Sequence, residues 1–526
     1  MGAGPTGLTA ALELSRLGVA VRLIEKAPRA STTSRSLGVQ ARTLELLHQR
    51  GLADEMVRLG NPAHGGSIYG GGKRVFRLDF SHVESRYNYV LILSQAETER
   101  ILREAIGRQG VEIERGVELI GIAQDVLSHD ASPVTAILRH PDGRLEETKA
   151  PWLISAEGAH SVARTTLDLQ FEGKTLDEDY VLGDLHLAGE LPEDDIHIFS
   201  SEHGFMGLFP MGRGHYRLIA SNPFSKPEKG TEPSLDELQR IYDQRSHIPA
   251  RLHDMGWSSW FRINSRMVPR LKIGRILLGG DAAHIHSPAG GQGMNTGIQD
   301  MINLGWKLAL VIQGGAPAAL LDTYEQDRLP VMRDVLFQTE KLTGLIGAES
   351  HLLRTVFNQL GPYIGGSSLV QENGTARMSQ LALGYRDSPL SENHAHAGRL
   401  HAGDRVPDLP VRHRIAAGWS DAGLQELLDP SRLVLLVAHG TDADRFDPAL
   451  RDAASGYGAE CVVRELSPGI ATADRTRYET TLGRSGVYLV RPDGYVGLAA
   501  GPHSAASRLA AYRRQWFAAR EAVHAH

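Results

Sequence analysis

The first 50 residues carry the apolar patterns of a β-α-β unit. Apolar side chains over residues 8–17 recur with helical spacing, and Gly18 ends the predicted helix. Residues 19–24 are mostly apolar and indicate a buried strand that closes at Glu25. A second helix is predicted over residues 41–49. These elements place the start of the chain in the α/β class.

The pattern then changes twice along the middle of the chain. An amphipathic helix is predicted over residues 94–102, with Ser94 as its N-cap. Short strands are predicted at residues 111–114, 118–126, 135–139 and 152–155. Residues 173–270 alternate strand patterns with glycine turns and contain one polar helix at 234–245, which indicates a β-rich insertion. Residues 275–345 return to a strand, a glycine loop and long helices.

A stretch without a steady period, near residues 362–400, precedes the last part of the chain. Beyond it, residues 432–438 form a predicted buried strand, and the turn Pro492-Asp493-Gly494 predicts a hairpin. A final helix is predicted over residues 504–519. These elements indicate a small, separate α/β domain.

Composition limits the possible functions. With 526 residues, 41% of them hydrophobic and 22% charged, the chain is typical of a soluble globular protein of several domains. A net charge of −6 gives no electrostatic reason to expect nucleic-acid binding, and no apolar run approaches the ~20 residues that span a bilayer. The single cysteine, Cys461, excludes an internal disulfide and favours the cytoplasm. We expect no metal site, and a monomer or a homodimer.

Gly2, Gly4 and Gly7 have the spacing of a dinucleotide-binding turn. In such a turn the first glycine makes the tight bend, the second lets the backbone approach a pyrophosphate, and the third lets the helix pack closely. Glu25 follows where a carboxylate accepts hydrogen bonds from ribose hydroxyls. The motif predicts dinucleotide binding, but adenosine recognition alone does not separate FAD from NAD.

This glycine turn normally follows a buried central strand, yet only Met1 precedes Gly2. Two interpretations stay open: the sequence starts inside the domain, or the protein lacks this strand. The intact pattern downstream favours the first. Under the second, the cofactor site would lose its floor.

A second glycine-rich motif lies more than 270 residues downstream. Residues 275–284 indicate a strand, a turn and a carboxylate, Asp281, at the end where open α/β sheets bind ligands. The loop 288–295 then leads into a helix predicted over 297–312. Its glycines allow the backbone to lie against a planar ring, and the helix start offers N–H groups to an anionic ring edge. Two such motifs indicate one long cofactor, FAD.

On these two motifs the chain resembles the single-component flavin monooxygenases of the para-hydroxybenzoate hydroxylase type, and most closely their phenol and polyketide hydroxylase branch. The resemblance implies an α/β fold with a Rossmann-type FAD-binding domain, an inserted β-sheet substrate domain and a C-terminal thioredoxin-like domain without CxxC. The implied boundaries are 1–172 and 271–390 for the FAD-binding domain with its helical linker, 173–270 for the insertion and 395–526 for the C-terminal domain.

The resemblance also implies cofactor contacts. The pyrophosphate would lie at the first glycine turn, the adenosine ribose at Glu25, and the ribityl or pyrophosphate side at Asp281. The positions implied to contact FAD elsewhere or to shape the isoalloxazine site are Arg42, Gln95, Pro288, Gly290, Gly291, Gln292, Gly293, Met294 and Asn295. NAD(P)H would reduce FAD, and a flavin C4a-hydroperoxide would transfer one oxygen atom from O₂ to an aromatic substrate.

A third family motif matches residues 157–164 with two departures. Glu157 replaces an aspartate, and Val162-Ala163 stands where the family has any residue followed by valine. The motif, which includes Gly158, serves both FAD and nicotinamide handling in the family. The C-terminal domain, from about residue 401, has no CxxC and so no disulfide chemistry; its expected role is structural or oligomeric.

The substrate is predicted only as a class. The insertion has no dense cationic cluster, and the apolar run 205–210 favours an apolar hydroxylated aromatic, either a phenol or a fused-ring polyketide. The general base stays unassigned among His215, Tyr216, Arg217 and His253, since strand alternation turns about half of them to solvent. The alternatives are a flavin oxidase, dehydrogenase or Baeyer–Villiger enzyme, and a catalytically weak flavin-binding protein.

Overall fold

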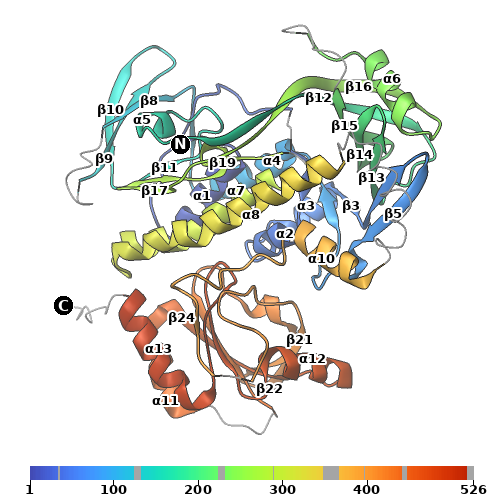
Figure 1. Cartoon of the computed structure of the whole chain (residues 1–526). Helices are drawn as coiled ribbons and strands as arrows, with labels where there is room; N and C mark the ends of the chain where they lie inside the picture. The colour runs from blue at the N-terminus through green and yellow to red at the C-terminus, as the bar shows by residue number, and fades with distance from the viewer. Residues whose placement is uncertain are drawn as a thin grey trace.

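The computed structural model describes residues 1–526 except 34–35, 124–131, 223–230, 288–289, 347–366, 396, 441–446 and 518–526. A larger body contains the first part of the chain, and a smaller C-terminal body lies beneath it (Figure 1). The long helix α8 (Asp322–Ile346) crosses the lower side of the larger body. Among the residues described, no helix is both long and apolar enough to cross a membrane.

Two small sheets with parallel pairs form the floor of the nucleotide-binding region. They contain β1 (Leu23–Glu25) with β7 (Ile113–Arg115), and β11 (Leu153–Ser155) with β18 (Ile276–Leu278) and β17 (Lys272–Ile273). The strand predicted at residues 19–24 is shorter in the structure, because only β1 makes ladder hydrogen bonds.

The first two residues lie between these sheets. The amino group of Met1 donates a hydrogen bond to the carbonyl of Ile154 (2.8 Å), and the Met1 carbonyl accepts one from the N–H of Ala156 (2.9 Å). On the other side, the N–H of Gly2 donates to the carbonyl of Ile24 (2.9 Å). Residues 1–2 therefore join β11 to β1, at the position of the central strand that the sequence left in question.

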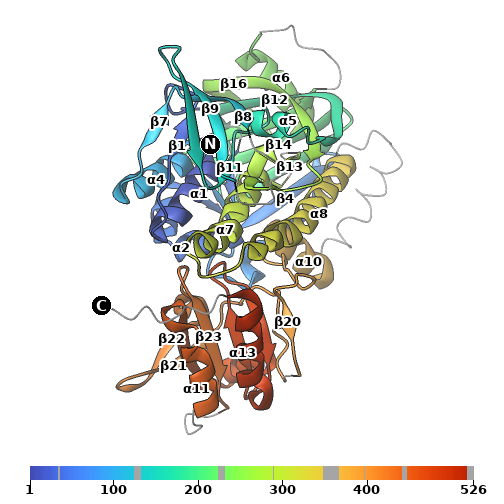
Figure 2. The same ribbon diagram turned by 90° about the vertical axis from the view of Figure 1, so that its left-hand side faces the viewer.

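Helices pack around this floor (Figure 2). Those of the larger body besides α8 are α1 (Pro5–Arg16), α2 (Ala41–His48), α3 (Ala53–Leu59), α4 (Gln95–Arg108), α5 (Val162–Thr166), α6 (Leu235–Arg245), α7 (Gly293–Ile312) and α10 (Ser368–Met378). As predicted, Ser94 caps α4 by accepting a hydrogen bond from the N–H of Glu97 (3.3 Å). Helix α1 contacts both α4 and α7. The contact with α7 is so close at Gly305 that a Cβ there would overlap the side chain of Glu13.

Two further small sheets flank the floor. One contains β2 (Gly38–Val39), β6 (Val90–Ile92) and β3 (Asn61–Ala63); the other contains β8 (Glu118–Ala123), β9 (Val134–Arg139) and β10 (Leu145–Ala150). The first places residues 38–39 next to the loop that precedes α7, where the flavin ring is expected.

An eight-stranded sheet forms the rest of the larger body. In order across the sheet its strands are β19 (His284–Ile285), β16 (Ala250–Met267), β12 (Glu172–Gly189), β15 (His215–Asn222), β14 (Gly204–Gly212), β13 (Asp195–Ser201), β4 (Gly65–Gly70) and β5 (Lys73–Asp79). The sheet is wider than the predicted insertion 173–270, because segments on both sides of it in the sequence supply edge strands. Helix α6 covers one face and begins with a complete capping box made by Ser234 and Glu237.

The C-terminal body has one seven-stranded sheet between helices. Its strands, in order, are β20 (Glu392–Asn393), β26 (Val496–Ala500), β25 (Val487–Val490), β23 (Leu433–Ala438), β24 (Cys461–Pro468), β21 (Pro410–Ile415) and β22 (Gly418–Gly423), and its helices are α11 (Pro448–Ser455), α12 (Thr472–Leu482) and α13 (Pro502–Trp516). Helices α11 and α13 share one core with the sheet, and α12 shares the other.

The thioredoxin-like character of this body stays a prediction, and the order of its elements is as follows. Strands β23 and β24 are parallel and joined through α11, and the antiparallel pair β25–β26 and α13 follow. Burial raises the pKa of the Cys461 thiol to about 12, so this single cysteine stays protonated at neutral pH.

Candidate flavin-binding site

The first glycine turn has three different surroundings at its three glycines. Gly2 has φ +92°, and a Cβ there would overlap the carbonyl oxygen of Ala156. A Cβ at Gly7 would overlap the carbonyl oxygen of Gly2. A Cβ at Gly4, by contrast, would meet no atom within 4 Å. Gly4 therefore faces open space at the start of α1, where no side chain caps the free N–H groups, and a pyrophosphate fits there.

Glu25 lies beside this turn at the end of β1. Its carboxylate accepts hydrogen bonds from the N–H groups of Ala3 (2.7 Å) and Ala27 (2.8 Å). These bonds fix the carboxylate next to the turn and leave lone pairs that can accept ribose hydroxyls. The position agrees with the role predicted for Glu25.

The second glycine motif touches the first directly. Gly280 has φ +56°, and a Cβ there would overlap the hydroxyl oxygen of Thr6, in the first turn of α1. A Cβ at Gly297 would overlap the same oxygen. Asp281, next to Gly280, is exposed. Although 270 residues separate the two motifs, they form one site, as the prediction of a single long cofactor requires.

Side chains hold the loop that precedes α7 against β2. The Asn295 amide donates hydrogen bonds to the carbonyls of Gly38 (2.9 Å) and Gly291 (2.8 Å) and accepts one from the N–H of Gln40 (2.9 Å). The Gln40 amide in turn donates to the carbonyl of Gly290 (2.8 Å). Asn295 therefore fixes the loop against β2, and contact of the loop backbone with the flavin ring stays a prediction.

Four other predicted residues lie elsewhere or act differently. The Arg42 guanidinium is buried and donates to Glu45 (3.1 Å) and to the carbonyl of Asp493 (2.8 Å) in the C-terminal body. Gln95 donates to Glu99 on its own helix, and Met294 packs into the core around α1. Contact of these three side chains with FAD stays a prediction. Pro288 lies outside the described residues.

Residues of the third motif contact the second motif. The Glu157 carboxylate accepts hydrogen bonds from the hydroxyl of Ser161 (2.9 Å), which is the N-cap of α5, and from the N–H of Ala163 in its first turn (3.1 Å). Arg164 donates to the carbonyl of Ala282, beside Asp281 (3.1 Å). Gly158 has φ +80° and open space at its Cβ position. Glu157 therefore binds the first turn of α5, and its role in handling FAD or nicotinamide stays a prediction.

A buried ion pair behind the second motif was not predicted. Asp300 accepts hydrogen bonds from the N–H of Gly280 (3.1 Å), from Nε2 of His284 (2.8 Å) and from Nε of Arg328 (2.8 Å). Burial would raise the pKa of Asp300, but the charges of Arg328 and His284 outweigh burial and hold this pKa below its ordinary value. The only sequence signal was that Asp300 is the one carboxylate of helix α7.

The eight-stranded sheet turns one face toward the loop beside β2. Arg217 lies on this face, where its Nε and Nη2 donate to the Asp184 carboxylate (2.7 and 2.8 Å) and its Nη1 donates to the carbonyl of Ser36 (3.4 Å). Tyr216 points to the opposite face, into the core under α6, and donates to the carbonyl of Leu191 (3.1 Å). Alternation thus separates these two candidates for the general base.

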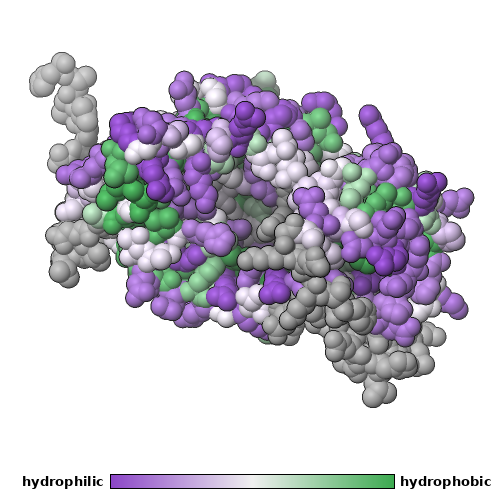
Figure 3. Space-filling view, turned by 90° about the horizontal axis from the view of Figure 1, so that it is seen from above, coloured by the Kyte–Doolittle hydropathy of each residue, from purple (hydrophilic) through white to green (hydrophobic). Residues whose placement is uncertain are grey.

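The remaining candidates lie further along the sheet, and His215 is a neighbour of this ion pair, because His186–His215 is the next cross-strand pair on the same face. His215 and His253 both stack on His186, with ring centroids at 5.1 and 5.6 Å. The run 205–210 divides by alternation: Met206 and Leu208 pack under α6, and Phe209 packs on the other face. Seen from above, the larger body is hollowed near its middle, and apolar residues line part of the hollow (Figure 3).

The two glycine motifs, the open space at Gly4 and the carboxylate at Glu25 define a flavoprotein. Residues 1–339 match the family of the FAD binding domain, and residues 400–519 match the C-terminal domain of aromatic-ring hydroxylases. The chain belongs to this family of FAD-dependent aromatic-ring hydroxylases.

Named relatives cover almost the whole chain. 6-Methylpretetramide 4-monooxygenase of Streptomyces rimosus is 36% identical over 97% of this chain and 91% of its own length. Pentachlorophenol 4-monooxygenase of Sphingobium chlorophenolicum is 33% identical over 84% of this chain and 80% of its own length. The structure of anhydrotetracycline hydroxylase from Streptomyces rimosus has a TM-score of 0.76, is 30% identical and covers 98% of both chains.

These findings confirm the predicted enzyme class. The chain is a flavoprotein monooxygenase that uses FAD, with NAD(P)H as electron donor. The oxidase, Baeyer–Villiger and inert flavin-binding alternatives are not favoured, because the relatives that match over most of the chain are monooxygenases.

Proposed function

We propose that the enzyme hydroxylates a fused-ring phenolic substrate of polyketide type, which lies between the flavin ring and the face of the sheet that carries Asp184. When bound and reduced by NAD(P)H, FAD would activate O₂, of which one atom enters the substrate and the other leaves as water. The chain must then orient the phenol, move its proton and exclude water. Several similar proteins are named for tetracycline-type or angucycline substrates, which supports the fused-ring class over a simple phenol.

Aromatic side chains on this sheet face support a flat, wide substrate. Trp257 is the cross-strand partner of Asp184, and its ring lies 5.8 Å below the Arg217 guanidinium. Further along the same face, the rings of Tyr180 and Phe261 lie 5.7 Å apart. Flat rings of a ligand pack well against such aromatic walls.

The observation that carries the proposal is the ion pair of Asp184 and Arg217. Arg217 is buried and holds both oxygens of Asp184, whose side chain stays partly exposed on the face toward residue 36. A carboxylate held this way can accept a hydrogen bond from a phenolic O–H and receive its proton, which makes the ring more nucleophilic. We therefore assign Asp184 the proton-accepting role and Arg217 the role of orienting Asp184.

The first test is a panel of simple phenols, resorcinols and fused-ring phenols, scored by stimulated NAD(P)H oxidation and by product mass. We expect a gain of one oxygen atom, with the highest kcat/KM for fused-ring compounds. Turnover of monocyclic phenols alone would contradict the substrate class. Lactone formation from a ketone would contradict the hydroxylase reaction.

The second test is Asp184→Asn. We expect kcat/KM to fall about 100-fold near neutral pH, the usual scale for a lost general base. Part of the loss should be recovered as the pH approaches the phenol pKa of about 10, because the substrate then ionises without help. Asp254→Asn, an exposed carboxylate on the same sheet, is the matched control and should keep its activity. A loss that is equal at every pH would contradict the proton-accepting role of Asp184.

A further inference from the structure

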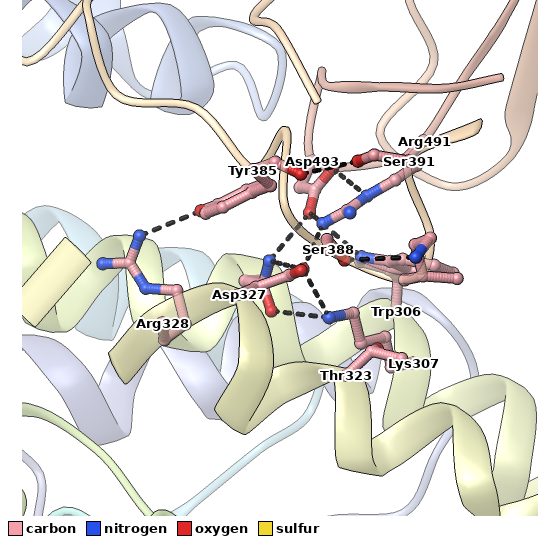
Figure 4. A network of polar contacts seen from close by, with 12 residues as sticks. Trp306, Lys307, Thr323, Asp327, Arg328, Tyr385, Ser388, Ser391, Arg491 and Asp493 are labelled. Carbon is pink, nitrogen blue, oxygen red and sulfur yellow. Dashed lines mark hydrogen bonds and ion pairs between the residues drawn. The ribbon is translucent and has the colours of Figure 1, made fainter. Parts of the chain in front are cut away.

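A network of buried charges joins the C-terminal body to the helices of the FAD-binding domain (Figure 4). Its C-terminal members, Arg491 and Asp493, lie at the tip of the β25–β26 hairpin. Nη2 of Arg491 donates both to Asp493 (2.5 Å) and to Asp327 of α8 (2.8 Å). Asp327 also accepts a hydrogen bond from Nζ of Lys307 on α7 (2.8 Å). All four side chains are at most 2% exposed.

These charges depend on one another. Burial would raise the pKa of Asp327, but the charges of Arg491 and Lys307 outweigh burial and keep this pKa below its ordinary value. Burial also lowers the pKa of Lys307 to about 8, against the opposing charge of Asp327. Breaking a buried pair by removing one partner leaves a charge without compensation, so the hairpin has a fixed position on α7 and α8.

Arg328, the next residue on α8, continues the path to the flavin site. It donates to Asp300 (2.8 Å), and Asp300 accepts from Gly280 and His284 at the two ends of the turn that contains Asp281. Arg328 also donates to the hydroxyl of Tyr385 (2.9 Å).

The ring of Tyr385 contacts the hairpin in turn. It lies 4.3 Å from the ring of Tyr495 and 5.1 Å from the Arg491 guanidinium. A continuous set of buried contacts therefore runs from the hairpin tip to the turn 280–284, which contains Asp281. Arg42, which donates to the carbonyl of Asp493, makes a second contact at the same tip.

We propose that the C-terminal hairpin is a positioning element for FAD. Arg491 and Asp493 fix α8 and Tyr385, these fix Arg328 and Asp300, and Asp300 fixes the turn 280–284. The C-terminal domain thus contributes to FAD affinity without a residue in the cofactor site. The hairpin residues contact Arg42, α8 and Tyr385, so we expect each to act on FAD through the turn.

The test uses Asp493→Asn in the full-length protein. FAD affinity is measured by titrating the FAD-free protein, together with its melting temperature and the visible spectrum of the flavin at saturation. We expect FAD to bind at least about fivefold more weakly, the lower range for coupled sites, with an altered flavin spectrum. Arg484→Gln, which breaks an exposed ion pair in the same domain, is the control and should change neither. An FAD affinity within about twofold of the parent would overturn the proposal.

A double-mutant cycle separates positioning from general destabilisation. Effects on FAD affinity should be non-additive for Asp493→Asn with Asp300→Asn, which lie on the same path, and additive for Asp493→Asn with Glu25→Gln, at the other end of the cofactor. Additivity in both pairs would overturn the proposal. If Asp493→Asn does not fold, Tyr385→Phe serves instead, because it removes only the hydroxyl that Arg328 contacts. It should weaken FAD binding, and unchanged binding would contradict the path.

Discussion

At the pyrophosphate end of the flavin site, the backbone makes the structure: Gly2 bends the chain, Gly7 lets α1 approach, and Gly4 leaves space for the ligand. At the other end, side chains of α7 hold the backbone: Asn295 holds the loop before α7 against β2, and Asp300 holds the turn 280–284. The first end is local in the sequence, whereas the second needs α8 and a part of the C-terminal domain in place.

The difference concerns how each end can fail. A backbone turn is disrupted when a substitution adds an atom that overlaps it, and we then expect FAD binding to be lost completely. In a loop held by side chains, the loss of one hydrogen bond should weaken FAD binding only in part, because the other hydrogen bonds still hold the loop. Substitutions at the two ends should therefore differ in the size and kind of their effects.

The largest effect is expected from Gly7→Ala. The new Cβ would overlap the carbonyl oxygen of Gly2, so the turn or α1 must move. We expect the free energy of unfolding to fall by at least about 3 kcal/mol, the upper range for overpacking, and FAD binding to be lost. Denaturant unfolding and FAD titration measure the two effects.

Gly4→Ala is the matched control for this turn. Gly4 has φ −77°, which alanine adopts freely, and its Cβ would meet no protein atom. Stability should therefore change by less than about 0.5 kcal/mol, while FAD binds more weakly because the methyl group occupies the pyrophosphate space. If Gly4→Ala binds FAD as the parent does, the pyrophosphate does not lie against this glycine.

A smaller effect is expected from Asp281→Ala, in the turn that Asp300 holds. Asp281 is exposed, so the fold should tolerate its loss. Losing a hydrogen bond to a charged group costs about 1.5–3 kcal/mol, so FAD should bind about ten- to a hundredfold more weakly. Full flavin occupancy after dialysis would show that Asp281 is not a cofactor contact.

The pyrophosphate end was predictable because its signals are short-range. The glycine spacing, the apolar stripe of α1 and the carboxylate at Glu25 lie within 25 residues, and the structure brings them together as predicted. The start of the helix predicted over 94–102 and its cap at Ser94 were right for the same reason, although the helix continues to Arg108. The Pro492-Asp493-Gly494 turn likewise predicted the β25–β26 hairpin.

The other end was only partly predictable because its contacts are long-range. The motif predicted the loop, but Asp300, Arg328 and the hairpin come from three separate segments, and no local pattern pairs them. Arg42 illustrates the same limit, because a buried arginine at the start of a helix can serve a ligand or a neighbouring domain. In the structure its guanidinium contacts the C-terminal domain.

The smallest expected effect is a pH dependence from His286, beside the start of α7. Nδ1 of His286 lies 3.1 Å from the carbonyl of Ser287, and Nε2 is buried without a hydrogen-bond partner among the described residues. Burial, together with the charge of His284, lowers the pKa of His286 to about 4. The folded protein therefore holds this imidazole neutral well below the pH at which an unfolded histidine gains its proton.

The sign of the effect follows from proton binding. Between about pH 6.5 and about pH 4 the unfolded chain binds a proton at this position and the folded chain does not, so stability falls as the pH falls through this window. The side chain is partly exposed, so we expect a loss of about 1–2 kcal/mol rather than the full value of the shift.

Urea unfolding of the parent and of His286→Gln at about pH 7 and about pH 5 measures this loss of stability, and the variant should lose less stability on acidification. His503→Gln, at an exposed position on α13, should behave as the parent does. Equal losses in the parent and in His286→Gln would contradict the lowered pKa of His286 in the folded protein.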